Sequence, residues 1–229
     1  MKINKILFLS VLSFLGLALQ FSGARDCKVK LEYVQSDAPA FKIGYQNQPE
    51  TVFTLSDLGF TTSQSGLFSN LKLKSVSGKK NIDENYVMLT GKRSRCINKG
   101  YEISYLFEDS GHHGLRLTFR VFNDGLAFRY EIPEADSVAI VKELTTFSFP
   151  SGIRRWTQRY RPGYEGFFDK GNGEVKGEWS FPALFEIRPS LYVLLSEAGV
   201  YRDQCGSKLT DNSRESDYQV TLIDDNFKV

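Results

Sequence analysis

Residues 115–132 read LRLTFRVFNDGLAFRYEI, and this stretch decides the fold class. Apolar residues alternate with polar or small ones on both sides of a short turn sequence, which is typical of strands with one buried face. The alternating apolar residues are Leu115, Leu117, Phe119 and Val121 before the turn, and Leu126, Phe128, Tyr130 and Ile132 after it. Asn123-Asp124-Gly125 is turn chemistry, in which we expect Gly125 to take a positive φ. The stretch predicts a β-hairpin.

The same alternation recurs outward from the hairpin, at residues 28–33, 41–46, 71–74, 101–108 and 218–222. Residues 138–149 are rich in β-branched side chains, and residues 191–195 resemble a fully buried strand. The helical signal amounts to one turn around Leu55–Leu58. No linker or repeat divides the chain, so we expect one all-β domain, built as an antiparallel sandwich.

The N-terminus has the pattern of a secretory signal peptide over residues 1–24. Lys2 and Lys5 are followed by a predominantly apolar region of 14 residues, 6–19, and Ser22-Gly23-Ala24 supplies small residues for cleavage before Arg25. The alternative is a retained membrane anchor, although this apolar run is short for a membrane span. We expect an exported protein, periplasmic or secreted, with a mature domain at residues 25–229 that makes no membrane contact after cleavage.

The charge balance argues against a nucleic-acid binder. The chain has 29 Lys and Arg residues against 27 Asp and Glu residues. Because Lys2 and Lys5 lie in the predicted signal peptide, the mature chain would carry 27 of each and be formally neutral. Nucleic-acid binding usually needs a basic excess on one face.

Cysteine and histidine give few options for chemistry. Cys27, Cys96 and Cys205 could form one disulfide in three ways or remain thiols, and their spacing matches no zinc motif. His112 and His113 are adjacent, and no Gly-x-Ser-x-Gly sequence accompanies them. We expect the histidines to lie in a turn before the strand that begins at Leu115.

The segment from Trp156 to Trp179 is the better candidate for a site. Aromatic rings can cover the C–H face of a sugar while charged groups bind its hydroxyls. The aromatic residues are Trp156, Tyr160, Tyr164, Phe167, Phe168 and Trp179, and the charged ones are Arg154, Arg155, Arg159, Arg161, Glu165, Asp169, Glu174 and Glu178. We take Trp156, Tyr160 and Tyr164 as substrate-binding candidates. The alternative is a loop that caps the sandwich, with its aromatic rings in the core.

Several motifs resemble the N-terminal domain of glycoside hydrolase family 97. They are Phe119-Arg120-Val121-Phe122-Asn123-Asp124-Gly125-Leu126-Ala127-Phe128-Arg129-Tyr130, Glu143-Leu144-Thr145-Thr146-Phe147-Ser148-Phe149-Pro150, Tyr164-Glu165-Gly166 and Ser196-Glu197-Ala198. The resemblance runs from about residue 28 to the end of the chain. It implies a β-supersandwich of the galactose-mutarotase kind, followed in the family by a (β/α)₈ catalytic barrel.

The resemblance also implies a role. Family members are exported, calcium-dependent hydrolases of α-glucosides or α-galactosides, and their catalytic carboxylates lie on the barrel. By motif position, Glu165 matches the glutamate that the N-terminal domain lends to the calcium site. We therefore expect no catalytic residue in this chain, weak calcium binding by it alone, an α-linked oligosaccharide as substrate, and the last strands and the barrel beyond Val229.

Two alternatives stay open. The aromatic segment could belong to a freestanding carbohydrate-binding module of the periplasm. A mutarotase-like enzyme on the same fold would need a histidine and a glutamate that converge on a sugar ring, and His112 or His113 would have to serve.

Overall fold

The structure is a computed structural model that describes residues 2–3, 6–12, 27–35, 38–46, 48, 50–63, 68, 70–133, 138–163, 166–171, 176–199, 205–211 and 216–223. These residues form β-strands joined by turns, and none of them lies in a helix. Accordingly, the described residues contain no helix with the length and apolar character needed to cross a membrane. The predicted all-β class is confirmed.

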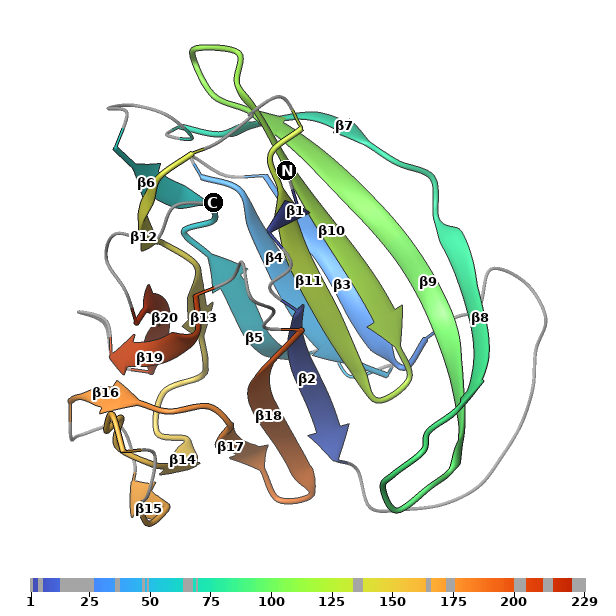
Figure 1. The fold of residues 1–229 in the computed structure, drawn as a ribbon, viewed down its shortest axis with the longest axis vertical. Helices are drawn as coiled ribbons and strands as arrows, with labels where there is room; N and C mark the ends of the chain where they lie inside the picture. Colours follow the sequence, from blue (N-terminus) through green and yellow to red (C-terminus); the bar gives the residue numbers. More distant parts are fainter. Residues whose placement is uncertain are drawn as a thin grey trace.

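The strands form two large antiparallel sheets and one small one (Figure 1). The 11-stranded sheet runs in the order β15 (Asp169–Gly171), β14 (Arg154–Thr157), β17 (Ala183–Arg188), β18 (Leu191–Ala198), β2 (Ile6–Leu12), β11 (Gly125–Glu131), β10 (Gly114–Phe122), β9 (Arg95–Glu108), β7 (Lys72–Val76), with β1 (Lys2–Ile3) beside β11 and β8 (Lys80–Val87) beside β9. The seven-stranded sheet runs β16 (Glu178–Trp179), β19 (Ser207–Asp211), β20 (Asp217–Leu222), β13 (Thr146–Ser148), β5 (Thr51–Ser56), β4 (Ala40–Tyr45), β3 (Val29–Val34). Strand β12 (Ile140–Glu143) pairs with β6 (Phe60–Thr62).

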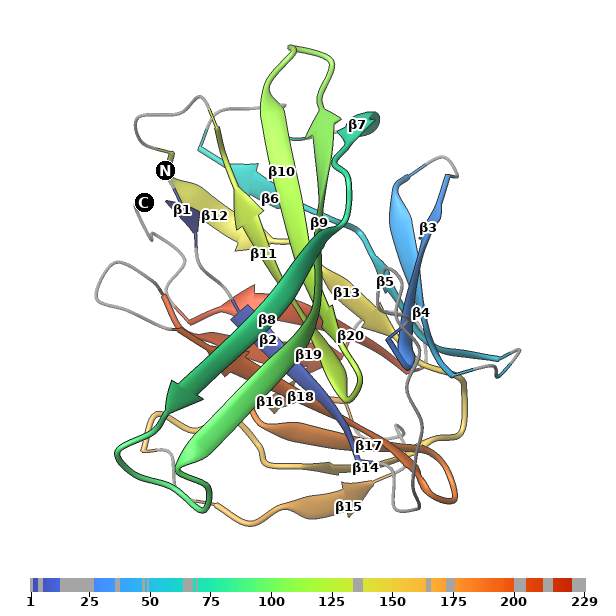
Figure 2. The same cartoon turned by 90° about the vertical axis from the view of Figure 1, so that its right-hand side faces the viewer.

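Aromatic side chains fill the space between the two large sheets. The Phe41 ring of β4 lies 4.7 Å from the Tyr105 ring and 4.6 Å from the Phe119 ring, centroid to centroid, and both partners come from the other sheet. Further along, Phe149 stacks on Phe185 at 4.4 Å. Figures 1 and 2 show β3–β5 as a layer separate from β9–β11. The predicted sandwich is therefore present, with the alternating residues of both sheets in its core.

The central hairpin is confirmed, with one difference at its turn. Strands β10 and β11 pair in register from Arg116 opposite Glu131 to Val121 opposite Leu126. Gly125 is the first residue of β11 and does not have the positive φ that we expected. The chain therefore turns without a left-handed glycine at this position, and the Asn123 side chain accepts a hydrogen bond from the Lys28 amide at 3.2 Å.

Two smaller predictions were wrong. Residues 51–56 form β5, so the expected helical turn around Leu55–Leu58 is absent, because β5 pairs on both sides with β4 and β13. Residues 191–195 are not buried on both faces. In β18, Leu191, Val193 and Leu195 are buried, while Tyr192 and Leu194 are half-buried on the opposite face.

Strands β1 and β2 come from the predicted signal peptide. Residues Ile6–Leu12 lie inside the larger sheet, paired on one side with β18 and on the other with β11. Strand pairing does not show whether the chain is cleaved before Arg25, so the signal peptide stays a prediction. Of the three cysteines, Cys27 and Cys205 are buried and Cys96 is half-buried.

Candidate functional site

The aromatic segment forms one end of both sheets. Strands β14 and β15 end the 11-stranded sheet, and β16 ends the seven-stranded one (Figure 1). In β14, Arg155 and Thr157 are buried, while Trp156 is half-buried on the opposite face. The Trp156 ring lies 6.3 Å from the Tyr192 ring of β18. These two rings make an aromatic surface on the outer face of the larger sheet.

Tyr160 has different neighbours from Trp156. Its amide donates a hydrogen bond to the Glu178 carbonyl at 2.9 Å, which places it beside β16. The ammonium group of Lys208 lies 4.9 Å from the Tyr160 ring centroid and 2.7 Å from the Glu178 carboxylate. Tyr160 is thus fixed at the edge of the smaller sheet, next to a lysine that can donate a hydrogen bond to a sugar hydroxyl.

Two predicted residues, Tyr164 and Glu165, lie outside the described residues. Directly after them, Phe167 is 91% exposed and Phe168 is 52% exposed. Two strongly exposed phenylalanine residues that are consecutive in the sequence are typical of a contact site. Phe167 and Phe168 therefore give the described part of this segment an exposed apolar surface.

A buried ion pair holds the base of this segment. The Arg155 guanidinium donates to the Asp211 carboxylate at 3.0 Å and to the Tyr218 hydroxyl at 2.8 Å. The same carboxylate accepts hydrogen bonds from the Trp179 indole at 3.0 Å and from the Gly177 amide at 3.1 Å. The guanidinium also lies over the Trp179 ring at 4.3 Å. Asp211 thus joins both ends of the segment to β19.

This network separates supporting residues of the segment from those that could face a ligand. Arg155 and Trp179 are buried, so they support the segment from the core and do not face a ligand. The Trp179 ring lies in the core, as the capping alternative expects of the aromatic rings, whereas Trp156 and Tyr160 are half-buried. Sequence reasoning missed Asp211, because it lies 56 residues from Arg155 in an otherwise ordinary strand.

The described residues contain no group of three His, Cys, Asp or Glu side chains arranged to hold a metal ion. Calcium takes six to eight oxygen ligands. Glu165 lies outside the described residues, so calcium binding there stays a prediction.

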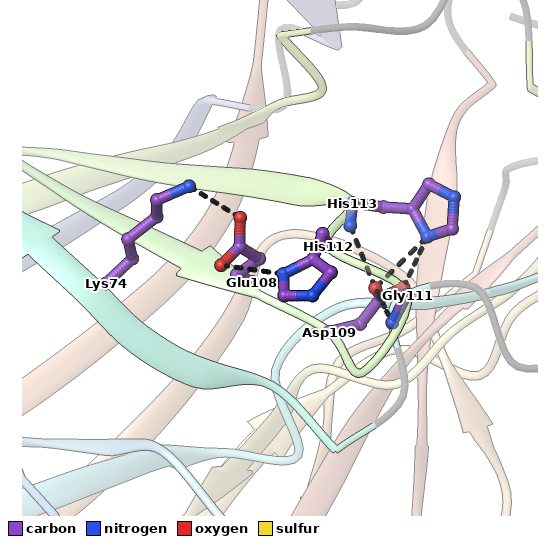
Figure 3. A network of polar contacts seen from close by, with 6 residues as sticks. All are labelled: Lys74, Glu108, Asp109, Gly111, His112 and His113. Atoms are coloured by element: carbon purple, nitrogen blue, oxygen red, sulfur yellow. Dashed lines mark hydrogen bonds and ion pairs between the residues drawn. The ribbon is translucent and has the colours of Figure 1, made fainter.

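The turn between β9 and β10 is a second polar cluster (Figure 3). The buried Asp109 carboxylate accepts hydrogen bonds from the Gly111 amide at 2.8 Å, the His113 amide at 2.9 Å and the Phe68 amide at 2.8 Å. The Nδ1 atom of His113 lies 3.1 Å away. Burial by itself raises the pKa of Asp109, but these hydrogen bonds outweigh it and hold that pKa below its usual value. Asp109 thus stays ionised and ties the turn together.

The neighbouring pair, Glu108 and His112, borders a cavity of about 660 Å³. Glu108 is hydrogen-bonded to Lys74, which lowers the pKa of the carboxyl, and His112 Nδ1 lies 3.5 Å from it. A general base works best with a pKa near the working pH, and the pKa shifts of Glu108 and Asp109 go the other way. The predicted turn role of the histidines is confirmed, because His112 and His113 lie in the turn before β10, and the mutarotase-like alternative stays a hypothesis.

A family model described as "Glycosyl-hydrolase 97 N-terminal" matches residues 22–223. The chain belongs to glycoside hydrolase family 97. It corresponds to the N-terminal domain of this family, which is also what the long hairpin motif predicted.

Relatives of the family 97 domain are longer than this chain. A "Probable retaining alpha-galactosidase" of Streptomyces bingchenggensis (strain BCW-1) is 29% identical over 178 residues, which cover 76% of this chain and 27% of the relative. A solved "beta-arabinopyranosidase" is 27% identical with a TM-score of 0.77, and the match covers 84% of this chain and 33% of that one. A family 97 enzyme from Pseudoalteromonas sp. strain K8, solved with panose, is 22% identical with a TM-score of 0.75, covering 85% and 30%. The chain thus spans about a third or less of these relatives.

Residues of the family motifs form hydrogen bonds that stabilise this domain. In the hairpin motif, the Tyr130 hydroxyl lies 2.9 Å from the Thr145 hydroxyl and accepts a hydrogen bond from the Gly59 amide at 3.3 Å. In the later motif, the Glu197 carboxylate accepts hydrogen bonds from the Ser207 amide at 3.0 Å and hydroxyl at 2.8 Å. That contact joins β18 of one sheet to β19 of the other. These motif residues therefore hold the sandwich together.

Proposed function

We propose that this chain is the N-terminal, carbohydrate-associated domain of an exported, calcium-dependent α-glycosidase of the α-glucosidase or α-galactosidase type. The observation that carries the proposal is the family match over residues 22–223. The curated relative named as an alpha-galactosidase and the structure solved with panose favour an α-linked oligosaccharide as the substrate. The predicted signal peptide supports export.

In this proposal the domain packs on a catalytic barrel and does no chemistry alone. Glycoside hydrolysis needs two placed carboxylates, one as acid and one as base or nucleophile. The proposal puts both on the barrel. The domain's contribution is the segment between β14 and β16, whose base is fixed by Arg155 and Asp211 and whose exposed part carries Phe167 and Phe168. Glu165 in this segment would reach the calcium ion.

An activity assay tests the non-catalytic part. Purified chain should not turn over nitrophenyl α-galactoside or nitrophenyl α-glucoside. Turnover that follows the protein through gel filtration and persists in Glu165→Gln would contradict the proposal.

Calorimetry with calcium chloride tests the metal part. One carboxylate supplies few of the ligands that calcium needs, so we expect weak binding that Glu165→Gln abolishes. Glu178→Gln is the matched control, because Glu178 pairs with Lys208 in the same segment. Equal binding by all three proteins would remove Glu165 from the site.

A freestanding carbohydrate-binding module is the second candidate. The half-exposed surface of Trp156 and Tyr192 favours it, because paired aromatic rings offer a platform for a sugar ring. Titration with α-glucans and galactosides should then show weak binding that Trp156→Ala removes without loss of the fold. Tyr86→Ala is the control, since Tyr86 is exposed on β8. A flat titration of the unaltered chain would exclude this candidate.

A further inference from the structure

The ribbon of β8 and β9 ends in a turn whose apolar side chains are exposed. The Met88 amide donates a hydrogen bond to the Ser94 carbonyl at 2.7 Å, which closes the turn. Leu89 in this turn is fully exposed. The exposed apolar residues of the ribbon tip, residues 86–97, are Tyr86, Val87, Met88, Leu89 and Ile97. Apolar surface grouped in this way is typical of a contact site.

Three cations accompany these apolar residues. Lys92 and Arg93 lie in the turn, Arg95 is the first residue of β9, and all three are exposed. None of them forms an ion pair with a residue that the structure describes. The two acidic residues of β8 face Lys99 and Arg120 instead. The ribbon tip therefore carries three uncompensated positive charges beside its apolar side chains.

The ribbon tip is a different surface from the segment that we assign to the barrel. Figure 1 shows the turn between β8 and β9 at the lower right of the molecule, whereas β14, β15 and β16 lie at the lower left. The contact proposed for the barrel therefore does not use the ribbon tip.

The combination of charges and apolar side chains favours one kind of partner. A soluble polyanion would bind the cations but would leave Leu89 in water. An anionic phospholipid bilayer offers phosphate groups at its surface and acyl chains directly beneath them. Arginine and lysine can keep their charged ends among the phosphates while neighbouring apolar side chains enter the acyl region.

We propose that the ribbon tip binds the surface of an anionic phospholipid bilayer, with Val87 and Leu89 at the acyl boundary and Lys92, Arg93 and Arg95 on the phosphates. This is a surface contact and not a membrane span. It departs from the sequence-based expectation of no membrane contact, because only the structure shows that these side chains are exposed together. It goes beyond the proposed function and does not depend on it.

Vesicle sedimentation of the full chain tests the cations. Binding should be tighter to an equal mixture of phosphatidylcholine and phosphatidylglycerol than to phosphatidylcholine alone, and added salt should weaken it. The variant Lys92→Gln/Arg93→Gln/Arg95→Gln should bind the mixed vesicles roughly 100-fold more weakly, at about fivefold for each charge removed. The matched control removes three exposed cations elsewhere, as Lys28→Gln/Lys42→Gln/Lys142→Gln, and should lose much less.

Substitutions of Leu89 test insertion. Leu89→Ser should weaken binding about tenfold and keep the salt dependence, whereas Val141→Ser, at another exposed apolar position, should not. In Leu89→Trp, brominated acyl chains should quench the added tryptophan, and in Val141→Trp they should not. The apolar run at residues 6–19 is the same in every variant, so its own contribution to vesicle binding cancels in these comparisons.

Four results would overturn the proposal. The first is equal binding to neutral and mixed vesicles, and the second is an equal loss in the two triple variants, which would show an effect of net charge alone. The third is a Leu89→Trp signal that brominated lipid does not quench. The fourth is a Leu89→Ser protein that loses self-association in sedimentation but binds vesicles unchanged, because the ribbon tip would then be an interface between copies of the chain.

Discussion

At the scale of single residues, the segment that carries the candidate site depends on charges inside the fold. The side chains of Arg155 and Asp211 are 2% and 3% exposed, and they hold each other together with Tyr218, Trp179 and Gly177. A buried ion pair adds little to the free energy of unfolding compared with an apolar pair of similar size. Removing only one partner is nevertheless costly, because it leaves an uncompensated charge in the core. Variants of one partner are therefore informative.

Arg155→Met should lower the free energy of unfolding by about 3–5 kcal/mol, because Asp211 would remain buried without its cation. Urea unfolding measures this change. Arg188→Met is the control, since Arg188 pairs with Glu50 at the surface and should cost below about 1 kcal/mol. Equal decreases in the free energy of unfolding for both variants would show that the buried Arg155 pair stabilises the fold no more than the surface pair does.

The lowered pKa of Asp109 makes the free energy of unfolding depend on pH in the acidic range. Its pKa is lowered in the folded state, so the ionised carboxylate stabilises the fold above its unfolded pKa of about 3.9. That contribution disappears as the pH falls through the lower, folded pKa. Asp109→Asn should cost about 1–3 kcal/mol at neutral pH, because an amide cannot accept all the bonds that Asp109 accepts.

Urea midpoints between neutral and strongly acidic pH check this prediction. The unaltered protein should lose stability on acidification more steeply than Asp109→Asn. Glu108→Gln should give a smaller loss at neutral pH, since Glu108 pairs with the exposed Lys74. Parallel pH profiles for the unaltered protein and Asp109→Asn would refute the role of Asp109.

At the scale of elements, the pairing of β9 with β10 depends on a glycine. Gly100 lies opposite Phe122, and a Cβ atom at Gly100 would be 2.1 Å from the Val121 carbonyl oxygen. The contact is with backbone, so the strands must move apart to accept any side chain. The close packing of β9 on β10 therefore restricts position 100 to glycine more strongly than β-propensity does.

Gly100→Ala should lower the free energy of unfolding by roughly 3 kcal/mol, the upper end of what overpacking usually costs. Denaturant unfolding at neutral pH measures it. Gly78→Ala is the control, because nothing lies within 4 Å of a Cβ at that position. A stable Gly100→Ala protein would mean that β9 can shift without cost.

At the scale of the whole molecule, the ribbon of β8 and β9 carries apolar side chains on its outer end. Figure 2 shows this ribbon crossing the face of the molecule to its lower edge. Leu89 is 100% exposed and Val87 is 69% exposed. Exposed apolar patches of this kind promote association.

We expect concentration-dependent self-association of the isolated chain, measured by sedimentation. The double variant Val87→Ser/Leu89→Ser should weaken it, whereas Val141→Ser, at another exposed apolar position, should not. A monomer at all concentrations would contradict this expectation and favour a freestanding module.

Much of the architecture could be predicted because it depends on residues that are close together in the sequence. Period-two alternation identified the strands around residues 29–34, 40–45 and 114–131, and a long motif identified the family. The candidate segment was also located from its composition. The expected helix at Leu55–Leu58 failed because pairing on both sides of β5 outweighs a weak local preference.

The sequence by itself therefore determined the all-β class, the central hairpin and the family, since these depend on neighbouring residues. The tertiary structure alone decided which charged residues are buried, because Arg155 meets Asp211 only when the ends of the two sheets come together. It also decided the place of Ile6–Leu12 between β11 and β18. That place could not be predicted from the sequence, because β11 and β18 lie more than 100 residues away along the chain and meet residues 6–12 only in the folded sheet.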